Sequence, residues 1–271
     1  MSNDKSQGAI KTMFAAIVIP TLLIVSVLFY MYILGSSANF EGGDPVNNQP
    51  VKEGIKHWFG VIHKGGFIVP ILIAINLIII TFSIERILTI AKARGKGNVE
   101  GFIRNVRSML ASDDIDNAIM ECDKQKGSTA NVIRSGLVKY KLVLGDSGME
   151  KEAKIAAIQK ELEEATALEL PMLSKNLVII STCASISTLI GLIGTVLGMI
   201  RSFAAMANAG APDTVALSTG ISEALINTAF GIIGSCIAII MYNYFSNKID
   251  ALTYGIDEAG FSVVQTFASK H

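Results

Sequence analysis

Four long apolar runs constrain the fold of this chain more than any motif does. They cover residues 13–34, 67–84, 177–200 and about 218–242. A helix needs about 20 mainly apolar residues to cross the hydrocarbon core of a bilayer. A spanning segment must also satisfy its own backbone hydrogen bonds, which a helix does. The runs therefore predict an all-α, polytopic transmembrane protein.

Composition agrees with a membrane protein and argues against several other classes. The sequence is 51% hydrophobic and 17% charged, whereas soluble domains are about 25% charged. Its formal net charge is zero, so no charge excess favours nucleic acid or a basic substrate. The cysteines Cys122, Cys183 and Cys236 are odd in number and read as small apolar residues. His57 and His63 lack a helical metal-ligand spacing, and we expect no metal or cofactor.

Basic residues next to the runs predict the orientation of the chain. Lys and Arg concentrate on the cytoplasmic side of membrane helices. The second run is followed by such a cluster, namely Arg86, Lys92, Arg94, Lys96, Arg104 and Arg107. The link between the third and fourth runs has no Lys, and Lys248 follows the fourth. Four spans then place both chain ends in the cytoplasm.

The first run is longer than the apolar region of a secretory signal, about 7–15 residues, which favours a retained helix. Ser36-Ser37-Ala38 leaves cleavage open as an alternative. We assign residues 1–35 to a cytoplasmic tail and this extra helix. Residues 36–66 then face away from the cytoplasm, and their amphipathic stretch 55–62, with Trp58, suits the headgroup level.

Residues 91–173 form the only sizeable polar region, and we expect it to be cytoplasmic and helical. Apolar spacing predicts helices over 99–110 and 115–124, with a start signal at Asp113-Asp114, and glycines delimit the next helix. From Met149 the pattern continues into the third run, which predicts one long helix that Pro171 only kinks. After residue 66 we expect a span at 67–90, followed by the cytoplasmic region at 91–173. A second pair of spans at 174–205 and 218–246 follows, joined by an outer turn at 206–217. A cytoplasmic helix at 247–271 ends the order. The chain has no phosphate loop and no room for a catalytic domain, so we expect no enzyme.

The third and fourth runs differ from the first two in their many small and hydroxyl residues. Small residues at three- and four-residue spacing let helices approach closely. One such face contains Gly191, Thr195, Gly198 and Ser202, near Gly194, and the other contains Gly220, Ala224, Thr228, Gly231 and Ser235. We expect these faces to make contacts between subunits, and the first two runs to face lipid.

Glu223 is the only carboxylate well inside a span. An unpaired charge there costs several kcal/mol, about 2.5–3.5 on insertion scales. Its functional interpretation is a group that lines or controls an ion path. The structural alternative is a carboxylate that clamps neighbouring subunits.

Two threonines lie at one predicted depth. Thr195 is eleven residues from Met206, and Thr228 is eleven from Leu217, which places both ~16 Å below the outer turn at 1.5 Å per residue. Their hydroxyls can hold a water or relay a proton. Alternatively, each bonds a carbonyl of its own helix.

Arg201 and Asn227 are possible supporting residues. Arg201 is level with Glu223, so the two can pair, but its place near a helix end leads us to expect that it extends to the membrane surface. Asn227 lies one turn from Glu223 and either extends its polar stripe or bonds a neighbouring helix.

These residues carry a resemblance. The stretch GLIGTVLGMIRSF at 191–203, followed by GISEALINTAFG at 220–231, resembles the signature of the MotA/TolQ/ExbB proton-channel family, most of all its ExbB branch. The resemblance implies a bacterial inner-membrane homopentamer, with the third and fourth helices around a central pore. It also implies a dimer of ExbD-like single-span subunits, which carry the proton-accepting aspartate, and a TonB-like protein that drives outer-membrane transport. Its proton-pathway residues correspond to Thr195, Glu223 and Thr228.

The chain also departs from that pattern. ExbB proteins usually have three spans, and this chain has the additional run at 13–34. MotA-type stators have four spans but carry prolines in the third and fourth, whereas Pro171 precedes the third span here. A TolQ- or MotA-like stator and a non-conducting scaffold remain alternatives. An intramembrane enzyme lacks the paired catalytic groups that such a site needs.

Overall fold

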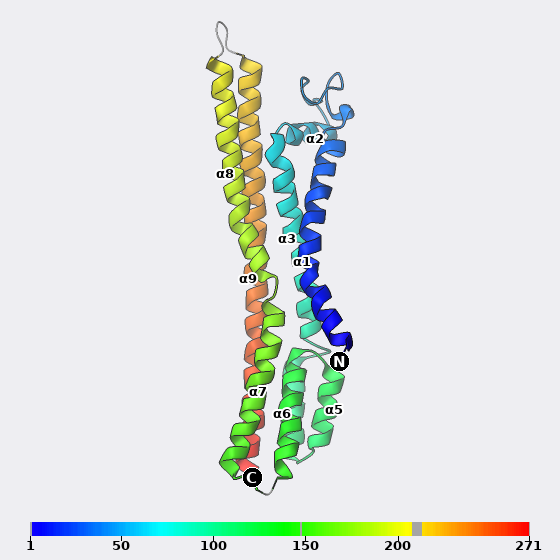
Figure 1. Ribbon diagram of the computed structural model, residues 1–271, viewed down its shortest axis with the longest axis vertical. Coiled ribbons are helices and arrows are strands. Elements are labelled where there is room, and N and C mark those ends of the chain that lie inside the picture. The colour runs from blue at the N-terminus through cyan, green and yellow to red at the C-terminus, as the bar shows by residue number, and fades with distance from the viewer. Residues whose placement is uncertain (1, 147, 208–212, 271) are drawn as a thin grey trace. The chain divides into compact units, whose positions relative to one another are not determined.

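Helices make up the fold of this chain in the computed structural model, which describes residues 2–146, 148–207 and 213–270 (Figure 1). Within these residues the only β feature is an isolated bridge between Phe40 and Pro50. In chain order the α-helices are α1 (Ser2–Leu28), α2 (Ile55–His63), α3 (Val69–Ala93), α4 (Val99–Ala111), α5 (Ile115–Gln125), α6 (Ser128–Leu144), α7 (Lys151–Ser174), α8 (Leu177–Ala207) and α9 (Thr214–Lys270). A π-helical turn, η1 (Phe29–Leu34), extends α1, and short 3₁₀ turns occur at Ser37–Asn39 (η2) and Gly66–Ile68 (η3).

The described residues contain four helical segments long and apolar enough to cross a membrane. These are Phe14–Leu34, Gly66–Ala93, and parts of Lys151–Ala207 and Thr214–Lys270. The prediction of an all-α polytopic membrane protein is therefore confirmed. The chain divides into two compact units, which we describe separately.

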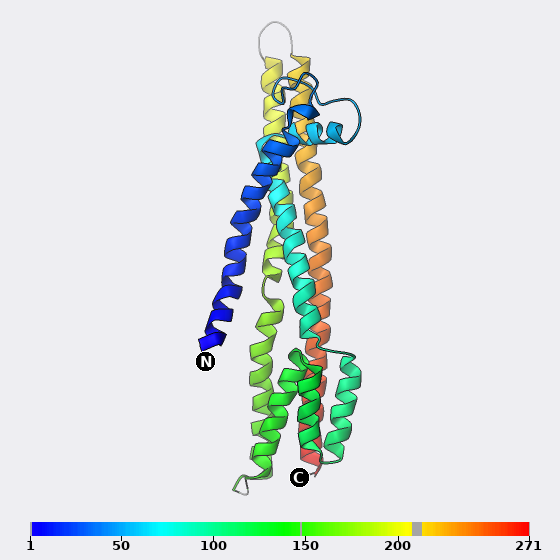
Figure 2. The ribbon, with the colours of Figure 1, turned by 90° about the vertical axis from the view of Figure 1, so that its right-hand side faces the viewer.

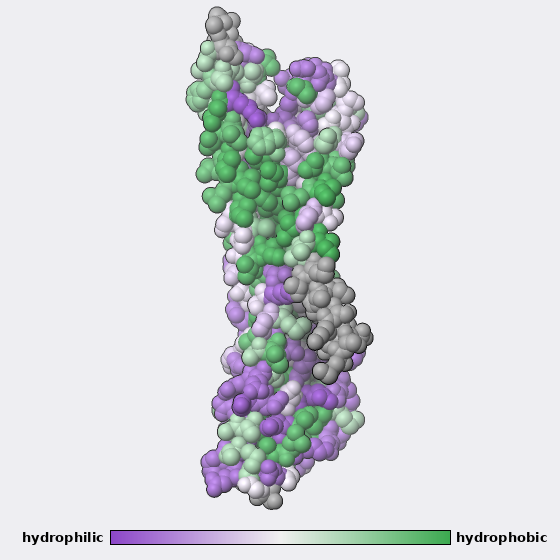
Figure 3. All heavy atoms as spheres, in the orientation of Figure 1, coloured by the Kyte–Doolittle hydropathy of each residue, from purple (hydrophilic) through white to green (hydrophobic). Residues whose placement is uncertain are grey.

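The first unit combines residues 1–83 with residues 178–242. It contains α1, α2, most of α3, and the parts of α8 and α9 that lie side by side in both views (Figures 1 and 2). Val69, Leu72, Ile79 and Phe82 of α3 are completely buried. Apolar residues cover much of the visible surface of this part of α8 and α9 (Figure 3). Such a surface suits lipid or another protein and not water.

The second unit combines residues 84–177 with residues 243–271. Helices α4 to α7 and the C-terminal part of α9 enclose one apolar core, in which Tyr140 and Phe267 meet edge to face with ring centroids 4.7 Å apart. The helices begin where the sequence supplies caps. The Asn98 side chain accepts a hydrogen bond from the Glu100 amide, and Asp114 accepts one from the Asn117 amide. The start signal expected at Asp113-Asp114 is therefore confirmed.

One prediction for this unit was wrong. The long helix expected to run from Met149 into the third span is interrupted, because α7 ends at Ser174 and α8 begins at Leu177. Pro171 lies inside α7 without ending it. The interruption follows at residues 175 and 176, where Asn176, five residues after Pro171, adopts a φ of +66°. Asparagine tolerates this left-handed conformation better than most residues.

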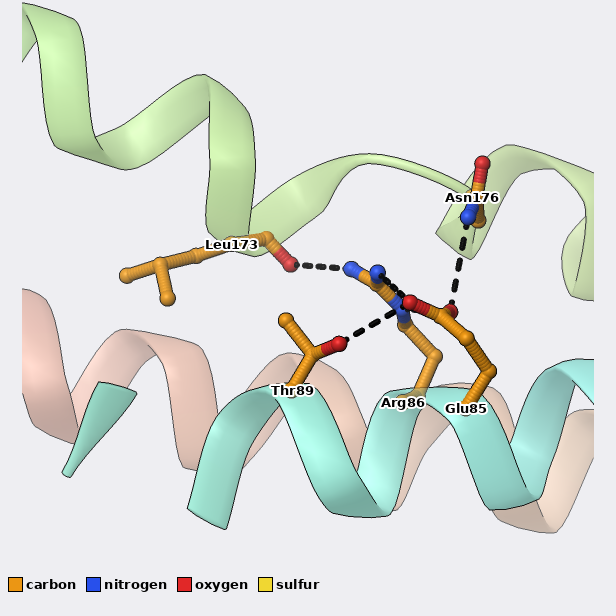
Figure 4. Close-up of polar contacts among 5 residues, drawn as sticks. All are labelled: Glu85, Arg86, Thr89, Leu173 and Asn176. Atoms are coloured by element: carbon orange, nitrogen blue, oxygen red, sulfur yellow. Dashed lines mark hydrogen bonds and ion pairs between the residues drawn. The ribbon is translucent and has the colours of Figure 1, made fainter. Parts of the chain in front are cut away.

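A buried arginine of α3 donates a hydrogen bond to a backbone carbonyl of the last turn of α7 (Figure 4). Arg86, only 2% exposed, donates from Nη1 to the Leu173 carbonyl at 3.0 Å. Its Nε and Nη2 donate to the Glu85 carboxylate at 2.6 and 2.5 Å. Thr89 and Asn176 donate to the same carboxylate at 2.9 and 3.4 Å. Carbonyls of a last helical turn lack helical partners, so this network stabilises the interruption.

Helix α9 continues without a break from Thr214 to Lys270. The segments expected separately at 218–246 and 247–271 thus lie on one helix. The expected turn at 206–217 is shorter in its described part, since α8 reaches Ala207 and Asp213 caps α9 by accepting from the Val215 and Ala216 amides. Residues 208–212 of that turn, and Ser147 in the predicted loop 145–148, lie outside the described residues.

Candidate functional site

Helices α8 and α9 approach each other backbone to backbone at their glycines. A Cβ atom added to Gly191 would lie 2.9 Å from the Asn227 carbonyl oxygen and 3.0 Å from the Gly231 Cα. One added to Gly198 would lie 2.7 Å from the Gly220 carbonyl oxygen. Real Cβ atoms do not fit at these distances, so larger residues would push the helices apart.

The small-residue faces were therefore assigned to the wrong contact. We expected them between subunits, but the structure shows that they pack α8 against α9 within one chain. The spacing of small residues predicts that a helix has a close neighbour, and it does not say whether that neighbour belongs to the same chain.

Thr195 and Thr228 meet in this packed region. Their Oγ1 atoms lie in hydrogen-bond contact, and both side chains are partly buried. The Thr195 hydroxyl also lies 3.2 Å from the Gly191 carbonyl, and the Thr228 hydroxyl lies 3.1 Å from the Ala224 carbonyl. Each hydroxyl has one proton to donate. Hence one threonine donates to the other, which donates to its own helix, and the two roles can exchange.

Further hydroxyls continue this pair along both helices at seven-residue spacing. Thr188 and Ser181 lie seven and fourteen residues before Thr195, and Ser235 and Tyr242 lie seven and fourteen after Thr228. Seven residues make nearly two helical turns, or ~10.5 Å, so each set shares one face. These four residues, with Ala184, Ser185 and Ile239, line an open groove of about 270 Å³. We call Thr195, Thr228 and these four residues the hydroxyl row.

Of this row, the sequence pattern indicated a relay role for Thr195 and Thr228 only; Ser181, Thr188 and Ser235 were grouped with the small residues of their helices, and Tyr242 was missed. The seven-residue spacing was the signal that could have found the row. This spacing identifies the row only once Thr195 and Thr228 are known to face each other, because that contact fixes the rotation of both helices.

Glu223 lies in a different environment from the threonine pair. Its side chain is 5% exposed and forms an ion pair with Arg201 of α8, whose side chain is 49% exposed. The expectation that Arg201 only extends to the membrane surface was thus wrong, and the pairing alternative is the one found. Counting residues predicts that Arg201 and Glu223 lie at one level along their helices, but it does not predict the rotation that turns Arg201 toward α9.

Glu223 and Thr228 are not brought together. Five residues on a helix correspond to a rotation of ~140°, so the two side chains leave α9 in different directions. Among the described residues, no hydrogen bond joins Glu223 to either threonine. The candidate site therefore has two parts, a hydroxyl row and a paired carboxylate.

Asn227, one turn from Glu223 on α9, bonds an earlier part of the chain. Its Nδ2 donates to the Gly65 carbonyl at 2.9 Å, and the residue is completely buried. The side chain fits because Gly194 has none, since a Cβ there would lie within 2.5–2.7 Å of Asn227 atoms. Asn227 thus bonds a backbone carbonyl 162 residues away, a partner that nothing in the sequence pattern indicates.

Residues preceding α3 complete the surroundings of Arg201 and Glu223. The Phe67 ring centroid lies 5.7 Å from the Arg201 guanidinium carbon. Tyr30 of η1 stacks on His63 with ring centroids 4.5 Å apart, and its hydroxyl donates to the His63 carbonyl at 3.0 Å. Across the described residues, no group of three or more His, Cys, Asp or Glu is arranged to hold a metal ion.

Comparison with known sequences places this arrangement in a family. The profile of the MotA/TolQ/ExbB proton channel family matches residues 124–258, a range that contains Thr195, Arg201, Glu223 and Thr228. The biopolymer transport protein ExbB of Aquifex aeolicus is 33% identical over 102 residues, which are 38% of this chain and 69% of that protein. The chain belongs to the MotA/TolQ/ExbB proton channel family.

Relatives within the family carry two kinds of name. The Tol-Pal system protein TolQ of Pseudomonas aeruginosa is 30% identical over 121 residues, 45% of this chain and 52% of that protein. The biopolymer transport protein ExbB of Pseudomonas putida is 24% identical over 196 residues, 71% of this chain and 59% of that protein. The chain thus spans only about half the length of these two relatives.

Proposed function

We propose that this protein is a proton-conducting subunit of a bacterial inner-membrane motor that converts proton motive force into mechanical work. The observation that carries the proposal is the hydroxyl row, which runs along two apolar membrane helices from the Thr195–Thr228 pair to Tyr242. Successive hydroxyls on each helix are ~10.5 Å apart, so the proposal requires water in the groove to bridge them. Hydroxyl groups and water both donate and accept hydrogen bonds and can together pass a proton along such a row. Acyl chains offer such hydroxyl groups no hydrogen-bond partner, so a row of them is not expected on a face that contacts lipid.

The ion pair of Glu223 with Arg201 leads us to propose a proton acceptor on another protein. This residue is the only carboxylate in the third and fourth apolar runs, and it is already paired with Arg201. A proton that moves along the hydroxyl row therefore needs another acidic group near the threonine pair. We propose that a companion protein with one membrane helix, like ExbD, supplies it as an aspartate.

Assembly into a homopentamer around a central pore accounts for the apolar residues that one chain leaves uncovered on α8 and α9. Leu189, Leu192 and Val196 of α8, and Leu225 and Ile232 of α9, are each more than half exposed. Since the small-residue faces already join α8 to α9, these larger side chains are the ones available for contacts with neighbouring subunits and lipid.

The partner system has two candidates. A TonB-like energy transducer, which serves outer-membrane transport, agrees with the relatives named ExbB. A Tol-Pal machine is the second candidate, because the relative that is 30% identical over 121 residues is named TolQ. Either system accommodates a companion subunit with a membrane aspartate.

Affinity purification of the tagged chain from its native membrane, followed by native mass spectrometry, tests this proposal. We expect five copies of this chain with a single-span protein that carries an aspartate in its span. The gene neighbours and identity of that protein decide between the two systems. A stable monomer without any companion subunit would contradict the proposal.

A further inference from the structure

The carboxylate of Glu223 is covered by a segment outside the region that the family profile matches. Residues 65–67 connect α2 to α3, and we call them the 65–67 junction. Each contacts the paired carboxylate or its neighbours in α8 and α9, although they lie well before the family match at 124–258. The family motif alone therefore does not build this part of the site.

Gly66 makes the closest approach of the three. Its φ is +79°, a conformation that glycine adopts without strain and that L side chains rarely adopt. A Cβ atom at this position would collide with Glu223 Oε1 and lie 2.9 Å from Cδ and 3.3 Å from Arg201 Nη1. The absence of a side chain at Gly66 is what leaves room for the ion pair.

The residues on either side of Gly66 fix its position. The Gly65 carbonyl accepts the hydrogen bond from Asn227, one turn from Glu223 on α9. The ring of Phe67 lies near the Arg201 guanidinium, within the range of a cation–π contact. Thus one flanking residue holds the junction to α9, and the other holds the arginine of the pair.

We propose that the 65–67 junction is a positioning element for Glu223, and that the missing side chain of Gly66 lets the carboxylate reach Arg201. The inference rests on the proposed function, in which Glu223 belongs to the proton-conducting machinery. A buried carboxylate that loses its cationic partner is left as an uncompensated charge. Displacing the junction should therefore separate Glu223 from Arg201 and leave its carboxyl group open to chemical modification.

The chain contains a matched control for the backbone effect of a substitution at Gly66. Gly54 has a φ of +80°, and a Cβ added there has no heavy atom within 4 Å. Gly54→Ala consequently imposes a positive φ on alanine without any collision. The difference between Gly66→Ala and Gly54→Ala isolates the contact with Glu223.

Labelling with dicyclohexylcarbodiimide measures whether Glu223 is held in its ion pair with Arg201, since this reagent modifies unpaired carboxyl groups in apolar surroundings. The purified protein in liposomes is labelled at pH 7.5, and modification of Glu223 is quantified by peptide mass spectrometry. We expect Gly66→Ala to increase labelling by at least about fivefold, which corresponds to about 1 kcal/mol. Gly54→Ala should label like the unmodified protein. Equal labelling of the two variants would overturn the inference.

Two further variants keep the test decisive if Gly66→Ala folds poorly. Phe67→Leu keeps an apolar side chain but removes the ring beside Arg201, and we expect a smaller increase in labelling. Glu223→Asp shortens the carboxylate by one methylene group, which relieves the collision but not the backbone strain, and should raise the melting temperature of the double variant above that of Gly66→Ala. A double variant no more stable than Gly66→Ala would show that backbone strain alone causes the defect.

Proton flux separates this inference from the proposed function. If the unmodified protein with its companion conducts no protons, the proposed function fails, while the labelling result still decides on the junction. If it does conduct, and Gly66→Ala labels and conducts like Gly54→Ala, the positioning role fails and the proposed function stands.

Discussion

Arg201 and Glu223 form an ion pair that joins α8 to α9, and only the glutamate side chain of the pair is buried. Removing one member of a buried pair leaves an uncompensated charge. We expect Arg201→Met to lower the free energy of unfolding by about 1–3 kcal/mol, the cost of an unsatisfied buried polar group. Glu223→Gln should cost less, because the neutral amide needs no cation.

A double-mutant cycle measures this coupling in detergent-solubilised protein by thermal unfolding. In the Glu223→Gln background, Arg201→Met should be milder than in the unmodified protein, since the charge to be compensated is gone. Effects that simply add would show that the two side chains do not stabilise each other.

Arg86 provides a prediction for the second unit. Its guanidinium bonds both the Glu85 carboxylate and the Leu173 carbonyl, a geometry that the single ammonium group of lysine cannot reproduce. We expect Arg86→Lys to destabilise the protein by about 2 kcal/mol. The control is Arg134→Lys, because Arg134 is half-exposed and, among the residues that the structure describes, bonds only Asp123, at 2.8 Å. That variant should change stability by less than about 0.5 kcal/mol. Similar losses in both would contradict the role given to Arg86.

We expect protonation of His63 to make the stability of the protein depend on pH. Burial of the imidazole, with the positive charge of Lys64 beside it, lowers the pKa of His63 below its ordinary value of 6.5. The unfolded chain therefore binds a proton more readily than the folded protein does. The contribution of neutral His63 to stability is present above pH 6.5 and is lost as the pH falls below that value.

The measurement is the melting temperature between pH 7.5 and pH 5. His63→Phe keeps a ring beside Tyr30 and Phe40, with which His63 is in ring contact, but removes the titrating group. We expect this variant to lose less stability than the unmodified protein as the pH falls. Parallel pH profiles would rule out His63 as the cause.

The helical membrane fold was predictable because it depends on local patterns. A run of apolar residues, a cap such as Asp114 and a glycine between helices act on their own neighbours in the chain, so the sequence displays them directly. The interruption after Ser174 was missed because it depends on a contact between residues far apart in the sequence. It depends on Asn176 in a left-handed conformation and on Arg86, which lies 87 residues before the carbonyl that it bonds.

For the candidate site, the sequence predicted which residues lie at the same level on α8 and α9. It did not predict how the two helices are rotated about their axes. Counting residues from the outer turn placed Thr195 level with Thr228, and the structure shows their hydroxyls in contact. The same count placed Arg201 level with Glu223 without showing that they face each other. Gly66 could not be found at all, since its role depends on a carboxylate 157 residues later in the chain.

Proton uptake by liposomes tests the central claim most directly. The protein is reconstituted with its companion subunit, and uptake driven by a potassium diffusion potential is followed with an internal pH dye. Thr195→Val removes one hydroxyl of the pair at nearly constant volume. The control is Thr182→Val, because the exposed Thr182 hydroxyl donates to the Val178 carbonyl of its own helix and to no other described residue. We predict that Thr195→Val reduces the uptake rate about fivefold, since one hydrogen bond contributes about 1 kcal/mol, and that Thr182→Val leaves the rate unchanged. Uptake by Thr195→Val at the unmodified rate would contradict a proton path through the Thr195–Thr228 pair.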